Sequence, residues 1–242
     1  MGGNAAALRP NTVPLRCGPW TGRAVLAVAW AAGAVALAQT AVGVVNAFTV
    51  ESEFLNPDVE GSLFQLVTAA VTAAAGAAAA VHAYLFAARG RRFAVLAAIL
   101  LYFAADDALV LHERLGEAVG EGLFGLEGHL AVRLWVVLLA PLLVAAVVLV
   151  ISEARGAGAP LRGLLEAGVG ALVAAVVVEL AGAVTRDPSF VDRVSGKPET
   201  LRYLAEEALE LGGWILIAGG LWVLTVARME GDGAVSADAR RP

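Results

Sequence analysis

The amino-acid sequence predicts an all-α, polytopic membrane protein in which six transmembrane helices form one bundle with both termini in the cytoplasm. Composition is the first reason: 59% of the 242 residues are hydrophobic and 16% are charged, whereas a soluble domain carries about 45–50% apolar and about 25% charged residues. The second reason is that the apolar residues fall into six long runs, each near the roughly 20 residues that a helix needs to cross a bilayer. The third is the uneven distribution of arginine between alternate connections, which predicts the orientation.

The first predicted span is 24–47. It follows residues 1–19, whose three prolines and lack of apolar periodicity predict a disordered N-terminal segment. Arginines, an apolar stretch and Ala36-Leu37-Ala38 also resemble a secretory signal with its cleavage site, so removal of residues 1–38 is an alternative. The apolar character continues to Phe48, however, which is long enough to span the bilayer.

The remaining spans belong to the same domain, residues 20–228. Each is rich in Ala, Val and Leu, and most are bounded by Arg, Gly or Pro, which predicts helices separated by short connections. After Arg228 the chain loses its apolar pattern, so residues 229–242 are expected to form a disordered tail. The predicted spans after the first are, in order, 62–88, 93–113, 130–151, 164–184 and 204–227.

Basic residues alternate along the chain. The N-terminal segment, the second and fourth connections and the tail hold 11 Lys and Arg, and the other connections hold 6. The positive-inside rule therefore places both termini in the cytoplasm. The first outer connection, 51–60, carries four acidic residues and no basic one.

Small residues predict how the helices pack, because close approach of backbones replaces the hydrophobic drive that lipid removes. On the fifth span Gly168, Leu172, Ala175 and Gly182 share one helical face with Glu179. We expect this face, and Glu179 with it, to point into the bundle.

Acidic residues inside the predicted spans gather at one depth. With a rise of about 1.5 Å per residue, Asp106 lies roughly 21 Å from Arg92, Glu179 roughly 25 Å from Arg162, and Glu210 roughly 27 Å from Arg228. All three fall in the outer third of the bilayer, where unpaired carboxylates mark functional sites by default. On a continuous third helix, Asp106, Val110, Glu113 and Glu117 form one stripe, and His112 points about 120° away from it.

The acidic residues at this depth predict a cavity that opens to the extracytoplasmic side and holds a divalent metal ion. Carboxylates with one or two imidazoles suit Zn, Mn or Fe, and such a metal could activate water against a membrane-resident substrate, with a spare carboxylate as general base. The predicted metal ligands are Asp106, His112, Glu113, His129, Glu179 and Glu210. The predicted catalytic residues are Asp106, Glu179 and Glu206.

Other interpretations use the same residues. The carboxylates could bind protons or cations in a transporter or channel subunit, although the cytoplasmic halves offer few polar groups beyond His82, Thr72 and Gln39. They could instead pair with Arg114, Arg133 and Arg202 in a structural layer. A haem between His112 and His129 and a non-catalytic assembly partner are further alternatives, so enzyme status stays open.

Several classes are excluded or disfavoured. A net charge of −5 and the lack of a basic motif disfavour nucleic-acid binding. The one cysteine cannot form an internal disulfide. The expected partners are the lipid bilayer and a lipid or cation substrate. Sixteen of the 17 basic residues are Arg, which favours a bacterial protein of the cell membrane. His82 is expected to pack between helices rather than bind a ligand.

Overall fold

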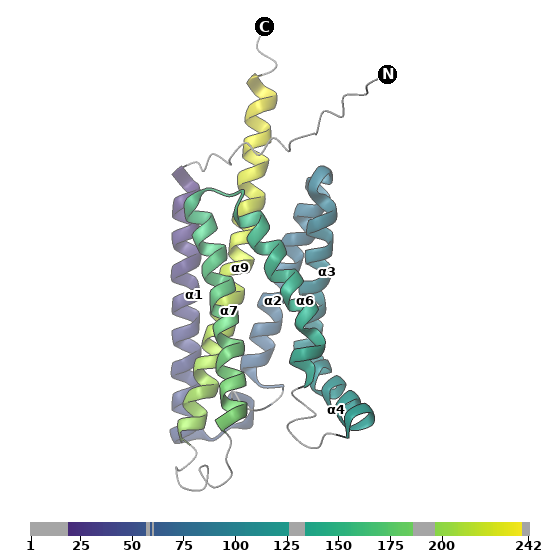
Figure 1. Ribbon diagram of the computed structural model, residues 1–242. Helices are drawn as coiled ribbons and strands as arrows, with labels where there is room; N and C mark the ends of the chain where they lie inside the picture. The colour runs from purple at the N-terminus through teal and green to yellow at the C-terminus, as the bar shows by residue number, and fades with distance from the viewer. Residues whose placement is uncertain (1–18, 57–58, 60, 126–133, 186–196, 239–242) are drawn as a thin grey trace.

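The computed structural model describes residues 19–56, 59, 61–125, 134–185 and 197–238, and these residues form helices and turns without a strand. Figure 1 shows long helices running side by side, with the start of α1 and the end of α9 at the same end of the molecule. In chain order the helices are α1 (Pro19–Val45), η1 (Asn46–Val50), η2 (Glu53–Leu55), α2 (Leu63–Leu85), α3 (Ala87–Leu109), α4 (Leu111–Phe124), α6 (Leu134–Ala154), α7 (Ala159–Thr185) and α9 (Lys197–Asp238).

Five of these helices are long and apolar enough to cross a membrane by themselves, and the pair α3 and α4 gives a sixth if it is counted as one broken span. The all-α class is therefore confirmed, with five to six membrane-spanning helices.

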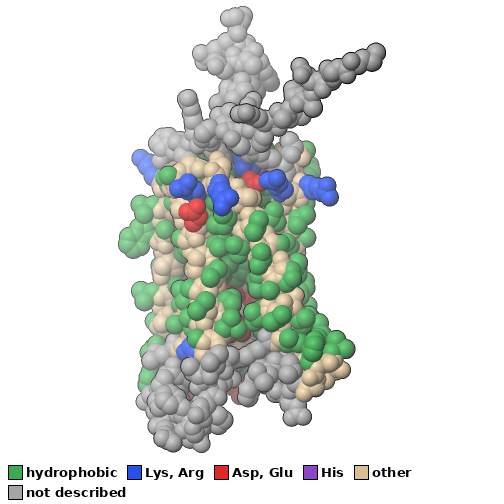
Figure 2. Space-filling view, in the orientation of Figure 1, with side chains coloured by type: hydrophobic (Ala, Val, Ile, Leu, Met, Phe, Trp, Pro, Cys, Tyr) green, Lys and Arg blue, Asp and Glu red, His purple; other side chains and the backbone are tan. Residues whose placement is uncertain are grey.

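Side-chain chemistry divides the molecule into two ends. Basic side chains form a band at one end (Figure 2), which we call the arginine-rich end. The described arginines that lie near the helix termini at this end are Arg23, Arg91, Arg92, Arg155, Arg162 and Arg228. The opposite end, which we call the acidic end, carries Asp106, Asp107, Glu207 and Glu210.

Helix boundaries differ from the predicted spans in three places. The predicted connection at 89–92 lies inside α3, because the chain turns at Phe86, where α2 ends. The third predicted span, 93–113, is interrupted at Val110. The last helix does not end at Arg228, where the tail was expected to begin, but continues to Asp238. Disorder was expected over residues 1–19; Pro19 is instead the first residue of α1, and residues 1–18 lie outside the described residues.

The core is built around α9, which packs against α1, α2 and α7, while α2 also packs along α3. Helix α6 contacts α3, α4 and α7. Large apolar side chains fill the space between these helices, and fully buried examples are Phe93, Leu96, Leu100, Leu165, Leu211, Ile217 and Leu221.

Small residues set the distance between α7 and α9. A Cβ on Gly168 would lie 2.9 Å from Ile217 Cγ1 and 3.0 Å from the carbonyl oxygen of Gly213. A Cβ on Gly213 would in turn lie 2.8 Å from Leu172 Cδ2. The predicted inward orientation of the Gly168, Leu172 and Ala175 face is therefore confirmed, and its physical cause is backbone contact at this crossing.

Candidate functional site

The acidic end is shaped by a sharp break between α3 and α4. Leu109 ends α3, Leu111 begins α4, and the two helices are bent by 81°. Val110 between them has φ 54° and ψ 43°, a left-handed conformation that is strongly disfavoured for a β-branched residue. Such strained backbone persists only where surrounding structure holds it, and it is concentrated at functional sites.

The break corrects the predicted arrangement of the third span. Glu113 and Glu117 do not continue the Asp106 stripe, because the helix axis turns after Leu109. His112, which an ideal helix would point away from Asp106, is instead its hydrogen-bond partner: Nδ1 lies 3.0 Å from Asp106 Oδ2. The predicted divergence of these two side chains is therefore wrong.

Asp106 and His112 form a partly enclosed pair. Asp106 is 6% exposed, and the His112 ring packs at a tilt against Trp135 of α6, with 4.9 Å between the ring centroids. The second carboxylate oxygen of Asp106, Oδ1, is buried without a hydrogen-bond partner among the described residues. The pair therefore leaves one buried acceptor available.

Helix α9 brings further carboxylates to the same place. Asp107 interacts electrostatically with Glu210, His112 and Asp106, and Glu207 interacts with Glu210, Asp107 and Glu206. Trp214 Nε1 donates a hydrogen bond of 3.3 Å to Glu210 Oε1. Glu207 Oε2 is buried with no partner among the described residues. We call Asp106, Asp107, His112, Glu207 and Glu210 the acidic cluster.

Basic groups near the acidic cluster do not match its carboxylates in number. Arg202 Nη1 donates to Glu206 Oε2 at 2.9 Å, and its guanidinium lies 4.1 Å from the Tyr203 ring centroid. Arg114 has an exposed side chain, and Arg133 lies outside the described residues. Within the described residues, one arginine is thus paired at the rim while four carboxylates and one histidine form the cluster.

The predicted metal ligands are only partly brought together. Asp106, His112 and Glu210 belong to the acidic cluster, and Glu113, in the first turn of α4, interacts electrostatically with His112. Glu179 is a partly buried residue of α7. His129 lies outside the described residues. Among the described residues, no group of three or more His, Cys, Asp and Glu side chains is arranged to hold a metal ion.

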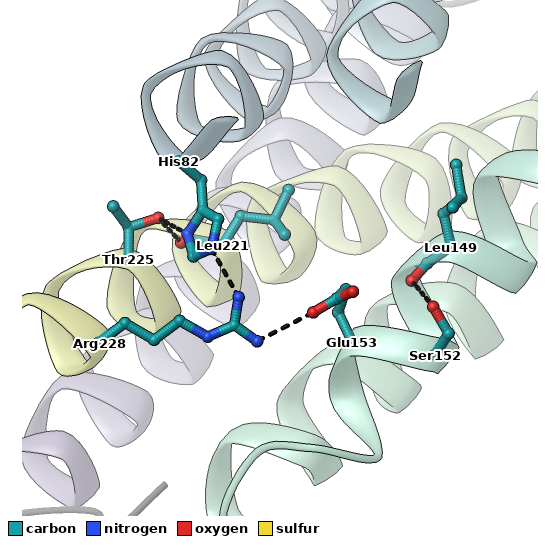
Figure 3. Close-up of polar contacts among 7 residues, drawn as sticks. All are labelled: His82, Leu149, Ser152, Glu153, Leu221, Thr225 and Arg228. Atoms are coloured by element: carbon teal, nitrogen blue, oxygen red, sulfur yellow. Dashed lines mark hydrogen bonds and ion pairs between the residues drawn. The ribbon is translucent and has the colours of Figure 1, made fainter. Parts of the chain in front are cut away.

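Two groups of residues that were not among the predicted metal ligands or catalytic residues take part in polar clusters. Asp107 and Glu207 are each adjacent to a residue already singled out, and only the tertiary arrangement, in which α2 packs against both α3 and α9, shows that they belong to the cluster. Glu153 and Arg228, at the arginine-rich end, form a buried network with His82 and Thr225 (Figure 3). The sequence signal for this network was a charged residue within two positions of the end of a long apolar run, Glu153 after Ile151 and Arg228 after Ala227, which also describes an ordinary helix end.

Comparison with known proteins identifies a family whose description names no activity. The family model described as "Domain of unknown function (DUF8692)" matches residues 13–225. No curated protein and no solved structure matches the chain.

Proposed function

The chain belongs to the DUF8692 family, and we propose from the geometry of the acidic cluster that it binds and releases a small cation, above all the proton, as a proton- or cation-coupled membrane transporter or channel subunit does. The observation that carries this proposal is a pair of buried carboxylate oxygens, Asp106 Oδ1 and Glu207 Oε2, that have no hydrogen-bond partner among the described residues. An unsatisfied buried oxygen costs about 1–3 kcal/mol, and more when it is charged. A bound proton or cation removes that cost.

Charge supports the same proposal. Two carboxylates that share a site cannot both ionise freely, so one of them holds a proton. Asp107, Glu207 and Glu210 interact with one another across α3 and α9, which is the arrangement that lets a proton be shared between helices. Ionisable residues of this kind inside membrane helices mark proton and ion pathways.

A metal-dependent hydrolase is the second candidate, and one contact favours it. Metal-binding histidines commonly donate their other ring nitrogen to a carboxylate, which orients the ring. With Nδ1 of His112 bonded to Asp106, Nε2 is the nitrogen that could bind a metal, with Asp106 orienting the ring. Further ligands would have to come from rearranged carboxylates or from residues outside the described ones, such as His129, and Glu179 or Glu206 would then be the candidate general base for attack on a membrane-resident substrate.

The first experiment measures proton binding by the purified protein. Infrared difference spectra recorded across a pH titration detect protonated carboxyl groups, and we expect a band that disappears in Glu207→Gln and shifts in Asp107→Asn. Glu117→Gln is the matched control, because Glu117 is an exposed carboxylate of α4. Loss of the band in Glu117→Gln, or its retention in both cluster variants, would contradict the assignment to the cluster.

Flux and metal content separate the two candidates. In proteoliposomes with an imposed pH gradient, wild-type protein is expected to move protons and Glu207→Gln to lose most of that flux. Stoichiometric Zn, Mn or Fe in the wild-type protein, lost in His112→Ala and accompanied by no proton flux, would instead favour the metal site.

A further inference from the structure

A buried chain of hydrogen bonds crosses the arginine-rich end of the bundle (Figure 3). His82 of α2 lies between two partners from α9: its Nδ1 is 2.9 Å from Thr225 Oγ1 and its Nε2 is 2.6 Å from Arg228 Nη1. Arg228 Nη2 donates at 2.9 Å to Glu153 Oε2 of α6. All four side chains are buried, and His82 is 0% exposed. One histidine and one arginine thereby join α2, α6 and α9.

The arginine fixes the protonation state of the histidine. A guanidinium only donates hydrogen bonds and stays charged, so His82 Nε2 must accept from Arg228 through its lone pair. The ring proton is then on Nδ1, which donates to Thr225 Oγ1. The Thr225 hydroxyl in turn donates its hydrogen to the carbonyl oxygen of Leu221 at 2.8 Å. From Arg228 through His82 and Thr225 to Leu221 every donor points the same way, and this order requires a neutral histidine.

We propose that this network is a latch that holds α2, α6 and α9 together while His82 is neutral and that opens when His82 takes up a proton. The incoming proton binds the lone pair of Nε2, and the hydrogen bond from Arg228 Nη1 breaks, since two N–H donors then face each other. The new imidazolium and the guanidinium also repel at this distance. Arg228 keeps its bond to Glu153 and His82 Nδ1 can still donate to Thr225, so the contact that is lost is the one that joins α2 to α6 through Arg228.

The groups around His82 explain why protonation of this ring would break the network. Helix α9 contributes Arg228, α6 contributes Glu153 through that arginine, and α3 contributes the Phe93 ring, stacked on the imidazole with 3.8 Å between centroids. Arg91 and Arg92, just before Phe93, have exposed side chains. A protonated His82 therefore meets a fixed positive charge directly and reaches the carboxylate of Glu153 only across that charge. Histidine is also the side chain whose unperturbed pKa gives a change of charge between about pH 5 and pH 8.

The test measures a distance across the latch. In a Cys17→Ser background, spin labels at Tyr84→Cys on α2 and Met229→Cys on α9 occupy side chains that are 88% and 44% exposed. Pulsed electron paramagnetic resonance should give one distance population at about pH 8 and a growing, longer population towards about pH 5. In His82→Gln the amide oxygen can accept from Arg228 and cannot be protonated, so the short population should persist at both pH values.

The control separates the latch from the acidic cluster. Glu207→Gln alters the other end of α9 and should leave the pH-dependent change in place, whatever that variant does to proton binding. A wild-type distance that does not respond to pH, or an equal response in His82→Gln, overturns the latch.

A second measurement follows the His82 ring itself. Nitrogen-15 spectra of histidine-labelled protein distinguish the two ring tautomers, and the chain has three histidines. Because His112 Nδ1 is bonded to Asp106 and is also protonated, the His82 signal is assigned by its loss in His82→Gln. That signal is expected in the Nδ1–H form at neutral pH and should convert to imidazolium as the labelled distances lengthen. If it carries its proton on Nε2 at neutral pH, the donor direction, and with it the latch, is wrong.

Discussion

Val110 shows how one residue decides which side chains meet at the acidic end. Its positive φ ends α3 after Leu109 and turns the chain by 81° into α4. That turn carries His112 to Asp106. The residues around it, Ala108-Leu109-Val110-Leu111, contain neither Gly nor Pro, so nothing local explains the break. Tertiary contacts at the acidic end therefore hold Val110 in a conformation that its own side chain disfavours.

Substitution of Val110 tests this strain. A left-handed conformation costs a residue with a Cβ about 1–2 kcal/mol, which glycine avoids, while glycine itself costs roughly 0.5–1 kcal/mol in unfolded-state freedom. Val110→Gly should therefore be neutral or stabilising by up to about 1 kcal/mol. Leu109→Gly, at the neighbouring helical position, should destabilise by about 1 kcal/mol. Thermal unfolding in detergent compares the two, and a larger loss in Val110→Gly would contradict the strain.

The pair Arg228 and Glu153 allows a second test at the residue scale. Breaking a buried ion pair by removing one partner typically costs about 3–5 kcal/mol, because a buried charge is left behind. Arg228→Gln should thus destabilise strongly, whereas Arg228→Gln with Glu153→Gln should recover part of the loss.

A double-mutant cycle of unfolding free energies measures the coupling between the two side chains, expected at about 0.5–3 kcal/mol. Additive effects would show that the 2.9 Å contact contributes little.

Packing of whole helices depends on where small residues lie rather than on how many there are. The chain contains 27 glycines, and only some lie at crossings. Gly168 lies against Gly213 and Ile217 of α9, while a Cβ on Gly170, two residues later on α7, would have no atom within 4 Å. Helix α7 therefore lies close against α9 at Gly168 and has open space at Gly170.

This difference predicts opposite outcomes for the same substitution. Gly168→Ala places a methyl group against backbone and should destabilise by about 1–3 kcal/mol, the usual cost of overpacking. Gly170→Ala meets open space and should be neutral or stabilising by up to about 1 kcal/mol, because alanine favours the helix. Denaturation of both variants under identical detergent conditions is the measurement, and equal destabilisation would contradict the α7–α9 crossing.

At the scale of the whole molecule, the two polar regions lie at opposite ends of α9 and are separated by apolar packing. Leu211, Ile217, Leu221 and Leu224 of this helix are 0–1% exposed and lie between the acidic cluster and the latch. The described structure therefore has a closed centre. Movement of a cation between the ends requires a rearrangement of this layer, and release of the latch is one way to permit it.

The orientation of the helix bundle in the membrane is a property of the whole molecule. The positive-inside rule places the arginine-rich end in the cytoplasm. A reporter in 89–92 or after Arg228 should therefore be active as a cytoplasmic fusion, and one in 51–60 or 187–198 as an extracytoplasmic fusion. A cytoplasmic signal from 51–60 would reverse the orientation and place the latch, rather than the acidic cluster, on the outer side.

The sequence by itself determined the class of the protein, the approximate positions of its helices and the end of the bundle that Asp106 and Glu210 share. These follow from apolar run length, helical rise and small-residue faces such as that of Gly168, all of which are local and periodic properties of the chain. Only the tertiary structure decided that His112 pairs with Asp106, that Asp107 and Glu207 join them, and that Glu153 and Arg228 enclose His82. Each of these contacts depends on a backbone break without a local signal or on the rotation of one helix against another, and neither is encoded in the spacing of residues along a single helix.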